Sequence, residues 1–249
     1  MDYQMITSRQ NALIKFVRSM DDKKNRDANS LFVVEGLKTV KEVYESGLLI
    51  KVLLYDEKAE RLLTDGVIGS AEKSELVSFD VLRSVSKEVS PQGVLALVKK
   101  PTSKPYGKGN CIFLDGVADP GNVGAILRTA AAAGYNDVFI TDDSADPYGE
   151  KAVRASMSGI FRVNVITGRR EDLVKRLPSL LVVADMDGKN VAEVKIDQPF
   201  CLCVGNEGRG VSDLLKKIAG LTVSIPMQNG IESLNAAVSA GILMYQLKR

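Results

Sequence analysis

The sequence predicts an α/β protein with a parallel β-sheet covered by helices. Short apolar runs alternate with helix-like stretches in the C-terminal half, and each run is apolar at successive positions. Strands of this kind are buried on both faces, as in a parallel sheet between two helical layers. A smaller set of alternating strands and helices comes first, followed by a segment rich in proline, glycine and lysine. We therefore expect a small N-terminal and a larger C-terminal α/β domain.

The N-terminal part divides into a basic segment, residues 1–29, and a small α/β domain, residues 30–98. The second range begins with an apolar strand, a helix and another strand, and the alternation continues to the run GVLALV. The helix has apolar positions at Leu37, Val40, Val43 and Tyr44.

Residues 99–110 read as a linker between the two domains. The segment KKPTSKPYGKGN holds two prolines, two glycines and four lysines but no acidic residue. The C-terminal domain then covers residues 111–249. Its expected strands are CIFLD, DVFIT, FRVNVI, LLVVAD, FCLCVG and LTVSIP, and most of them are separated by helical stretches.

The last helix has no polar face. Every residue from Ala236 to Tyr245 is apolar or small. A helix that is apolar all round is buried all round, so we expect part of it to pack on the sheet and part on a second copy of the chain. A two-fold homodimer is the common arrangement of this kind, and Ala240→Glu is expected to split it.

The composition excludes several kinds of catalysis. The chain has no histidine, so it lacks the commonest general base and metal ligand as well as any Ser-His-Asp triad or Cys-His pair. Chemistry must use carboxylates, amides, hydroxyls, Lys or Arg, and no metal is expected. The net charge of +2 is too small to identify a partner.

The three cysteines lie inside expected buried strands. Because Cys111, Cys201 and Cys203 are odd in number and apolar in context, we expect core residues and no disulfide. The N-terminal residues lack the apolar run of a signal peptide, and no stretch reaches the ~18 uncharged apolar residues of a membrane span. A soluble cytoplasmic protein with no membrane partner is the expectation.

The segment LDGVADPGNVGAILRTAAAAG is a strand end, a glycine-containing turn and a helix, which is the general form of a phosphate-binding loop. Its glycines, Gly116, Gly121 and Gly124, do not have the G-x-G-x-x-G spacing of a dinucleotide loop, and no G-K-[ST] follows. The spacing therefore disfavours a nucleotide-dependent oxidoreductase. Taken alone, it favours glycines that only make a tight turn.

Two further segments repeat this arrangement. CVGNEGRGVS is a strand that ends in a glycine-rich turn, and IPMQNGIESLNAAVSAGI follows another strand and opens the last helix. In this order and spacing, the three segments resemble the signature motifs of the SpoU (TrmH-like) family of SPOUT methyltransferases. The matching positions are Asp119, Pro120, Asn122, Gly124 and Arg128 in the first; Gly205, Glu207 and Gly210 in the second; and Ile225, Pro226, Met227, Ser233, Leu234 and Asn235 in the third.

The resemblance implies methyl transfer from S-adenosylmethionine (SAM) to an RNA ribose 2′-OH, in a domain with a deep trefoil knot. It also implies that the small N-terminal domain binds substrate. The implied cofactor-binding residues are Gly205, Glu207, Ile225, Met227 and Leu234. The implied catalytic residues are Arg128, Asn122, Glu207, Ser233 and Asn235. We expect Arg128 to orient a phosphate and stabilise the developing alkoxide, since arginine is almost never deprotonated.

Each polar position also has an ordinary structural explanation. Asn122 and Ser233 could cap helices, Glu207 could lie in a turn near a helix start, and Arg128 could form a surface ion pair. Only the joint occurrence of three motifs favours catalysis.

Basic residues downstream of the first motif suggest contact with RNA, and the candidates are Lys151, Arg154 and Arg162. With few aromatic residues, recognition would depend on RNA shape and backbone. The N-terminal domain favours ribosomal RNA over tRNA. Alternatives that stay open are a tRNA 2′-O-methyltransferase, an RNA base methyltransferase and an inactive RNA-binding assembly protein.

Overall fold

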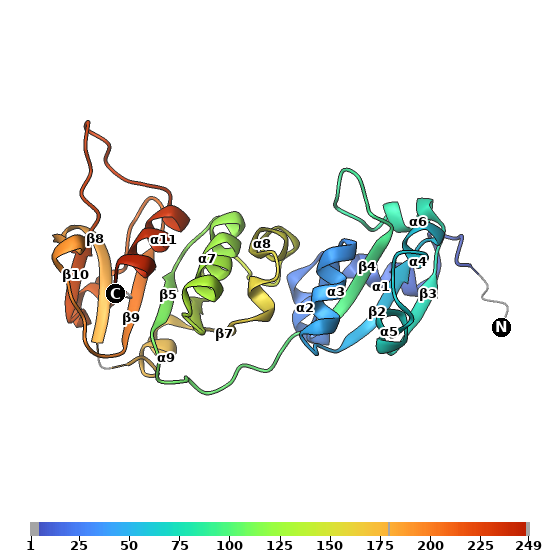
Figure 1. Ribbon diagram of the computed structural model, residues 1–249, viewed down its shortest axis with the longest axis horizontal. Helices are drawn as coiled ribbons and strands as arrows, with labels where there is room; N and C mark the ends of the chain where they lie inside the picture. The colour runs from blue at the N-terminus through green and yellow to red at the C-terminus, as the bar shows by residue number, and fades with distance from the viewer. Residues whose placement is uncertain (1–4, 179, 248–249) are drawn as a thin grey trace. The chain divides into compact units, whose positions relative to one another are not determined.

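The computed structural model describes residues 5–178 and 180–247, and these residues form two compact units. The first unit comprises the residues up to Thr102 together with Tyr148–Arg154. The second comprises Ser103–Pro147 and the chain from Ala155 onward (Figure 1).

The first unit is built on a four-stranded sheet with the strand order β1-β4-β2-β3. β4 runs antiparallel to both β1 and β2, whereas β3 runs parallel to β2. The strands are β1 (Leu31–Glu35), β2 (Ile50–Tyr55), β3 (Ser74–Leu76) and β4 (Val94–Lys99).

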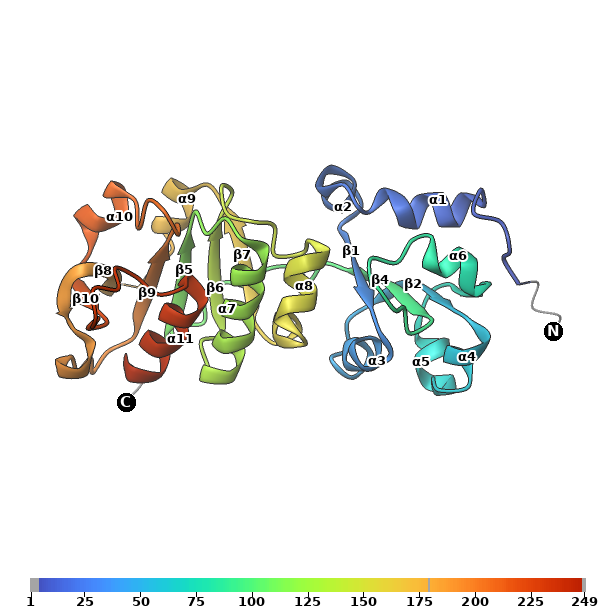
Figure 2. The same ribbon diagram turned by 90° about the horizontal axis from the view of Figure 1, so that it is seen from above.

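Helices lie on both faces of this sheet, as Figure 2 shows. They are α1 (Ala12–Ser19), α2 (Lys23–Asn29), α3 (Leu37–Glu45), α4 (Glu57–Glu60), α5 (Asp65–Ser70) and α6 (Phe79–Arg83). The unit includes helices before residue 30, because Ile14 and Val17 of α1 are buried in the same core cluster as Val81 of α6. Of the apolar positions of α3, Val40 and Val43 are buried, whereas Tyr44 is 43% exposed near the end of the helix.

The second unit is built on a six-stranded sheet in which every pairing is parallel, with the order β10-β8-β9-β5-β6-β7. This confirms the predicted parallel sheet. The strands are β5 (Cys111–Asp115), β6 (Asp137–Thr141), β7 (Asn164–Gly168), β8 (Leu180–Asn190), β9 (Phe200–Gly205) and β10 (Leu221–Ser224).

Helices cover both faces of the parallel sheet, with α7 and α11 on one face and α9 and α10 on the other (Figure 2). The helical elements of this unit are α7 (Pro120–Ala133), η1 (Gly159–Phe161), α9 (Arg170–Val174), η2 (Val191–Glu193), α10 (Asp213–Ile218) and α11 (Ala236–Leu247). Of α8 (Glu150–Ser156), the residues up to Arg154 belong to the first unit. Cys111, Cys201 and Cys203 are buried and free, which confirms them as core residues.

The last helix differs from its prediction in two ways. α11 begins at Ala236, so Ser233 precedes it. Ala240 is fully buried within the chain, because α11 packs on α7 and β9. Glutamate at position 240 would therefore disrupt the unit itself and not only a dimer. Val238 and Tyr245 are 51% and 53% exposed, so they form the uncovered side of the helix.

The end of the expected linker is fixed to the second unit. The Lys104 N–H donates to the Asn164 Oδ1 at 2.8 Å, and the Gly107 N–H donates to the Asp137 Oδ2 at 3.0 Å. Across the described residues, no helix is long and apolar enough to cross a bilayer.

Candidate active site

Two of the three motif turns start from neighbouring strands. β5 and β9 pair in parallel with Asp115 opposite Gly205, so both strands end at the same edge of the sheet. Ligands of open α/β sheets bind outside the carboxyl ends of strands. The turns that follow, at residues 116–119 and 206–212, are therefore adjacent where a ligand is expected.

The first turn leads into α7 through an N-cap at Asp119. The Asp119 Oδ1 accepts the Asn122 N–H at 3.0 Å, and Pro120 occupies the first helical position. Proline is suited to that position because its φ is fixed and no N–H is lost to the helix. Asn122 is thus not the cap of the helix, and its side-chain amide is available for other contacts.

Glu207 of the second turn binds the beginning of α7. Its Oε1 accepts the Asn122 Nδ2 at 2.8 Å and the Asp119 N–H at 3.4 Å, and its Oε2 accepts the Ala118 N–H at 3.2 Å. A carboxylate at a helix N-terminus is favoured by the helix dipole. Partial burial alone would raise the pKa of Glu207, but these hydrogen bonds outweigh it and lower the pKa below its ordinary value.

The third turn joins this arrangement through Asn235. The Asn235 Nδ2 donates to the Asn122 Oδ1 at 2.8 Å. The Asn235 Oδ1 accepts the N–H groups of Ala237 and Val238 at 2.9 and 3.3 Å, so this residue also caps α11. Glu207, Asn122 and Asn235 thus form one chain of hydrogen bonds that connects all three motifs.

The second turn is closely packed around Gly205. A Cβ atom at residue 205 would lie 2.2 Å from the Gly210 carbonyl carbon, so only glycine fits there. Asn206 fixes the turn on both sides: its Nδ2 donates to the Gly116 C=O at 2.8 Å, and its Oδ1 accepts the Gly208 and Arg209 N–H groups at 3.0 Å.

Arg128 lies on α7 with its side chain exposed. A Cβ atom at residue 159 would lie 2.6 Å from the Arg128 Cα, so Gly159 lets η1 approach the helix backbone at this residue. In the described parts of the chain, no hydrogen bond or ion pair engages the Arg128 guanidinium. Among these residues, Arg128 therefore does not form the surface ion pair that would have given it a purely structural role.

The remaining third-motif residues lie on the segment 225–235, between β10 and α11. Ile225, Met227 and Leu234 are half-buried, as an apolar cofactor-binding surface requires. Ser233 is exposed, and within residues 5–178 and 180–247 its side chain joins no hydrogen bond. The structure therefore does not bring Ser233 into contact with the chain formed by Glu207, Asn122 and Asn235.

The three predicted RNA-binding residues do not form one cluster. Lys151 and Arg154 lie on α8 within the first unit, and Arg162 directly follows η1 in the second. Arg154 is paired with Glu150 one turn earlier in the helix. Arg162 is exposed, within one turn of the glycine that contacts Arg128.

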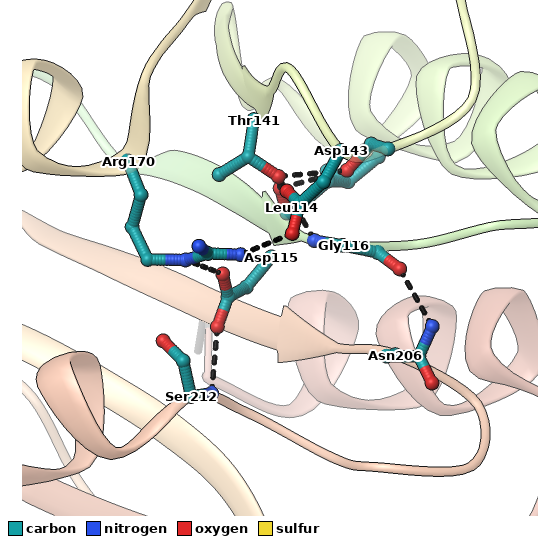
Figure 3. A network of polar contacts seen from close by, with 9 residues as sticks. Leu114, Asp115, Gly116, Thr141, Asp143, Arg170, Asn206 and Ser212 are labelled. Carbon is teal, nitrogen blue, oxygen red and sulfur yellow. Dashed lines mark hydrogen bonds and ion pairs between the residues drawn. The ribbon is translucent and has the colours of Figure 1, made fainter.

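A second polar network, not predicted from the sequence, lies at the end of β5 (Figure 3). Its centre is Asp115, which is 2% exposed and binds Arg170 and the Ser212 N–H. The detectable signal was a charged residue at the end of the apolar run CIFLD. The sequence could not indicate its partner, which lies 55 positions away.

The fold and the site define an α/β ligand-binding protein. Its glycine-containing turns meet at the carboxyl ends of parallel strands and are joined by amide and carboxylate side chains. The site uses neither histidine nor a P-loop. The chain belongs to the SpoU rRNA methylase family, whose sequence model matches residues 109–245. A second model, the MRM3-like substrate binding domain, matches residues 11–96.

Characterised relatives resemble the chain over almost its full length. The 23S rRNA (guanosine(2553)-2′-O)-methyltransferase RlmP of Bacillus subtilis is 31% identical over 98% of this chain and 99% of its own. The 23S rRNA (uridine(2479)-2′-O)-methyltransferase of Streptomyces viridochromogenes is 28% identical over 98% and 91%. The AdoMet-bound rRNA methyltransferase from Sinorhizobium meliloti superposes with a TM-score of 0.87 at 28% identity, covering 98% of this chain and 96% of that one.

Proposed function

We propose that this chain transfers a methyl group from SAM to a ribose 2′-OH of ribosomal RNA. The observation that carries the proposal is the hydrogen-bonded chain of Glu207, Asn122 and Asn235, which joins three turns that are far apart in sequence. The two curated relatives above are both named as 2′-O-methyltransferases of 23S rRNA. That agreement favours the ribose over a base and ribosomal RNA over tRNA.

The residues around the turns suit SAM. The half-buried Ile225, Met227 and Leu234 offer apolar surface for an adenosine, and Gly210 of the second turn has open space around its Cβ position, which leaves the backbone accessible there. Glu207 is anionic at neutral pH and holds the second turn against the first. When bound, SAM supplies an electrophilic methyl group on a positively charged sulfur.

The chain's own part in catalysis is to position the acceptor hydroxyl and stabilise its loss of a proton. Arg128 has an exposed guanidinium that would bind an RNA phosphate next to the target ribose and stabilise the developing alkoxide. Asn122 and Asn235 keep the start of α7 and the third turn together. Ser233 is exposed and lies two residues before Asn235 in the sequence, and we assign it to direct contact with cofactor or ribose.

The trefoil knot is part of the same proposal. After β10, at one edge of the sheet, the chain runs back through residues 225–235 to α11, which packs on α7 and on the central strand β9 (Figure 1). The Tyr135 hydroxyl donates to the Met244 carbonyl at 3.2 Å and fixes this return. This return from an edge strand to the centre of the sheet supports the proposed knot.

The first unit and the exposed side of α11 complete the proposal. We assign substrate binding to the first unit, with Lys151 and Arg154 as contacts, and place Arg162 at RNA beside Arg128. α11 would form a homodimer through its exposed Val238 and Tyr245. The proposed substrate places the protein in the cytoplasm.

The test is methyl transfer from labelled SAM to ribosomal RNA and, separately, to tRNA, each lacking the modification. Nuclease digestion identifies the product nucleoside. A 2′-O-methyl nucleoside in ribosomal RNA is the expected result. A methylated base or a product in tRNA would replace the assignment, and SAM binding without transfer to either RNA would favour an RNA-binding assembly protein.

The dimer has its own test. Val238→Glu places a charge on the exposed side of α11 and should give a monomer in sedimentation, with normal secondary structure. Glu45→Gln, on an exposed position of the first unit, is the control and should stay dimeric. A monomeric wild-type protein that transfers methyl groups would refute the dimer.

A further inference from the structure

Asp115 is a buried carboxylate at the end of the central strand β5, and the motifs do not account for it. Both of its oxygens are engaged: the Oδ1 accepts the Arg170 Nε, and the Oδ2 accepts the Ser212 N–H at 2.7 Å (Figure 3). A buried charge is costly unless it is paired and hydrogen-bonded. The pair therefore has to be kept intact for the end of β5 to keep this arrangement.

Arg170 connects Asp115 to the neighbouring turn. It lies at the start of α9, and its Nη2 donates to the Asp143 Oδ2 at 2.7 Å. Partial burial would lower the pKa of Arg170, but the bonds to Asp143 and Asp115 raise it above the ordinary value, so the guanidinium stays charged. Partial burial would likewise raise the pKa of Asp143, but bonds from Thr141 and Arg170 lower it.

Ser212 is the last residue of the second-motif turn, residues 206–212, and the turn is held at three places. Asn206 binds Gly116, Glu207 binds the start of α7, and Ser212 binds Asp115. The first two contacts fix the beginning of the turn. Asp115 is the side-chain contact that fixes its end. The Ser212 C=O accepts the Lys216 N–H of the following helix at 3.0 Å, and the Ser212 hydroxyl is buried without a hydrogen-bond partner among the described residues.

A packing contact at the same place could not replace this bond. Val211 is buried in the core beneath the turn. Apolar packing is non-directional, whereas a hydrogen bond to an ionised group fixes both distance and direction. Arg170 and Asp115 therefore fix the end of the turn relative to β5.

We propose that Arg170 and Asp115 are positioning residues for SAM, which act by holding the end of the second-motif turn at Ser212. The inference rests on the proposed function, since that turn follows Gly205 and carries Glu207. Neither residue touches the reacting groups. Their loss should weaken cofactor binding more than RNA binding, and saturating SAM should restore most of the rate.

The test compares Arg170→Gln, Arg170→Lys and Arg169→Gln with the wild type by calorimetric titration with SAM and by KM for each substrate. Arg170→Gln should raise the Kd and KM for SAM about tenfold, the size expected from losing a hydrogen bond to a charged group. The KM for RNA should stay within about twofold. Arg170→Lys should recover part of the loss, because an ammonium can bind Asp115 but lacks the planar fork.

Arg169→Gln is the matched control. Arg169 is the neighbouring residue and has an ion pair of its own with Asp172, but its side chain is 77% exposed and it binds none of the motif turns. It should leave the affinity for SAM unchanged. A tenfold loss in this variant would show that charge alone, and not the held turn, is responsible.

A second control separates positioning from general stability. Val165→Ala removes buried apolar volume from the edge strand β7 of the same unit, away from the turn. If it matches the loss of unfolding free energy of Arg170→Gln and weakens SAM equally, the positioning role is refuted. Unchanged SAM affinity in Arg170→Gln also refutes it. A wild-type protein that binds no SAM would instead refute the proposed function.

Discussion

The junction between the first two motif turns and the segment of the third motif are built in opposite ways. At the junction, Glu207 and Asn206 hold main-chain groups of the other turn at 2.8–3.4 Å, and Gly205 is packed against Gly210. The third segment, residues 225–235, is exposed or half-buried throughout, and Asn235 alone links it to Asn122. At the junction, the polar side chains are engaged in hydrogen bonds within the protein. In the third segment, the polar side chains other than Asn235 make no such bonds among the described residues and are available to a ligand.

The motif residues likewise divide into two kinds by their contacts, although Asn235 belongs to the third segment and Arg128 to α7. Asn122, Glu207 and Asn235 act first on the protein, because their hydrogen bonds are satisfied internally. Arg128 and Ser233 have exposed side chains and no such bonds among the described residues. Substitutions in the first group should change stability as well as activity, whereas substitutions in the second should change activity alone.

The largest effect is expected for Arg128→Ala, which tests the second group. Loss of its guanidinium should lower kcat by about 100- to 1,000-fold, the range found when a donor to a developing oxyanion is removed. SAM affinity and unfolding free energy should stay near the wild type. Single-turnover transfer, titration with SAM and urea unfolding measure the three quantities. An equal loss of SAM affinity would place Arg128 in the first group and break the comparison.

The next effect concerns two glycines of the junction. Gly205→Ala would force a Cβ into the Gly210 backbone and should cost about 3 kcal/mol of unfolding free energy, with loss of SAM binding. Gly210→Ala is the matched variant, because its site has open space but a φ of +69°, and it should cost about 1 kcal/mol. Urea unfolding measures both. The reverse order would mean that conformation, and not packing, shapes the turn.

A smaller effect should distinguish Asn235 from Ser233. Asn235→Ala removes the cap of α11 and the bond to Asn122, so it should cost about 1 kcal/mol of unfolding free energy. Ser233→Ala should change stability by less than about 0.5 kcal/mol and still reduce transfer. Unfolding curves and steady-state rates of the two variants provide the measurement. A stable and fully active Ser233→Ala variant would remove Ser233 from the site.

The smallest effect is the pH dependence that Glu207 gives to stability. Its pKa in the folded protein lies below the ordinary value of 4.5, so its hydrogen bonds contribute stability above about pH 4.5 and lose it as the pH falls through the folded pKa. The difference in unfolding free energy between wild type and Glu207→Gln should be constant near neutral pH and should shrink in acid. A difference that is unchanged down to pH 3 would contradict the assigned bonds.

The sequence predicted the parallel sheet because burial on both faces leaves a direct mark, namely continuous apolar runs. It also located the turns, since glycine and polar residues follow those runs. It could not predict which side of α11 is buried, because a helix without a polar face gives no indication that Ala240 would be buried and Val238 exposed. It also began the small domain at residue 30, whereas α1 contributes Ile14 and Val17 to the core of the first unit.

The hydrogen bonds of the site were beyond sequence reasoning for a different reason. Asp119 and Asn122 are both good helix caps, and only the observed geometry shows that Asp119 caps α7 while Asn122 reaches Glu207. The partners of Asn122 lie 85 and 113 residues away. Local patterns carry no information on pairs so distant, and the same holds for Asp115 and Arg170.

The pairing of β5 with β9 has a consequence for how the protein folds. Cys111 and Cys201 are register partners in this central pair, and the chain between them supplies β6 and β7 on one side and β8 on the other. Contacts so distant in sequence must overcome the entropy of closing a long loop, which makes folding slow. The turns proposed to hold the cofactor follow directly from these two strands, so the proposed binding site forms only when the two strands pair. A cofactor that binds only the form in which β5 and β9 are paired should stabilise that form and slow the unfolding of the protein.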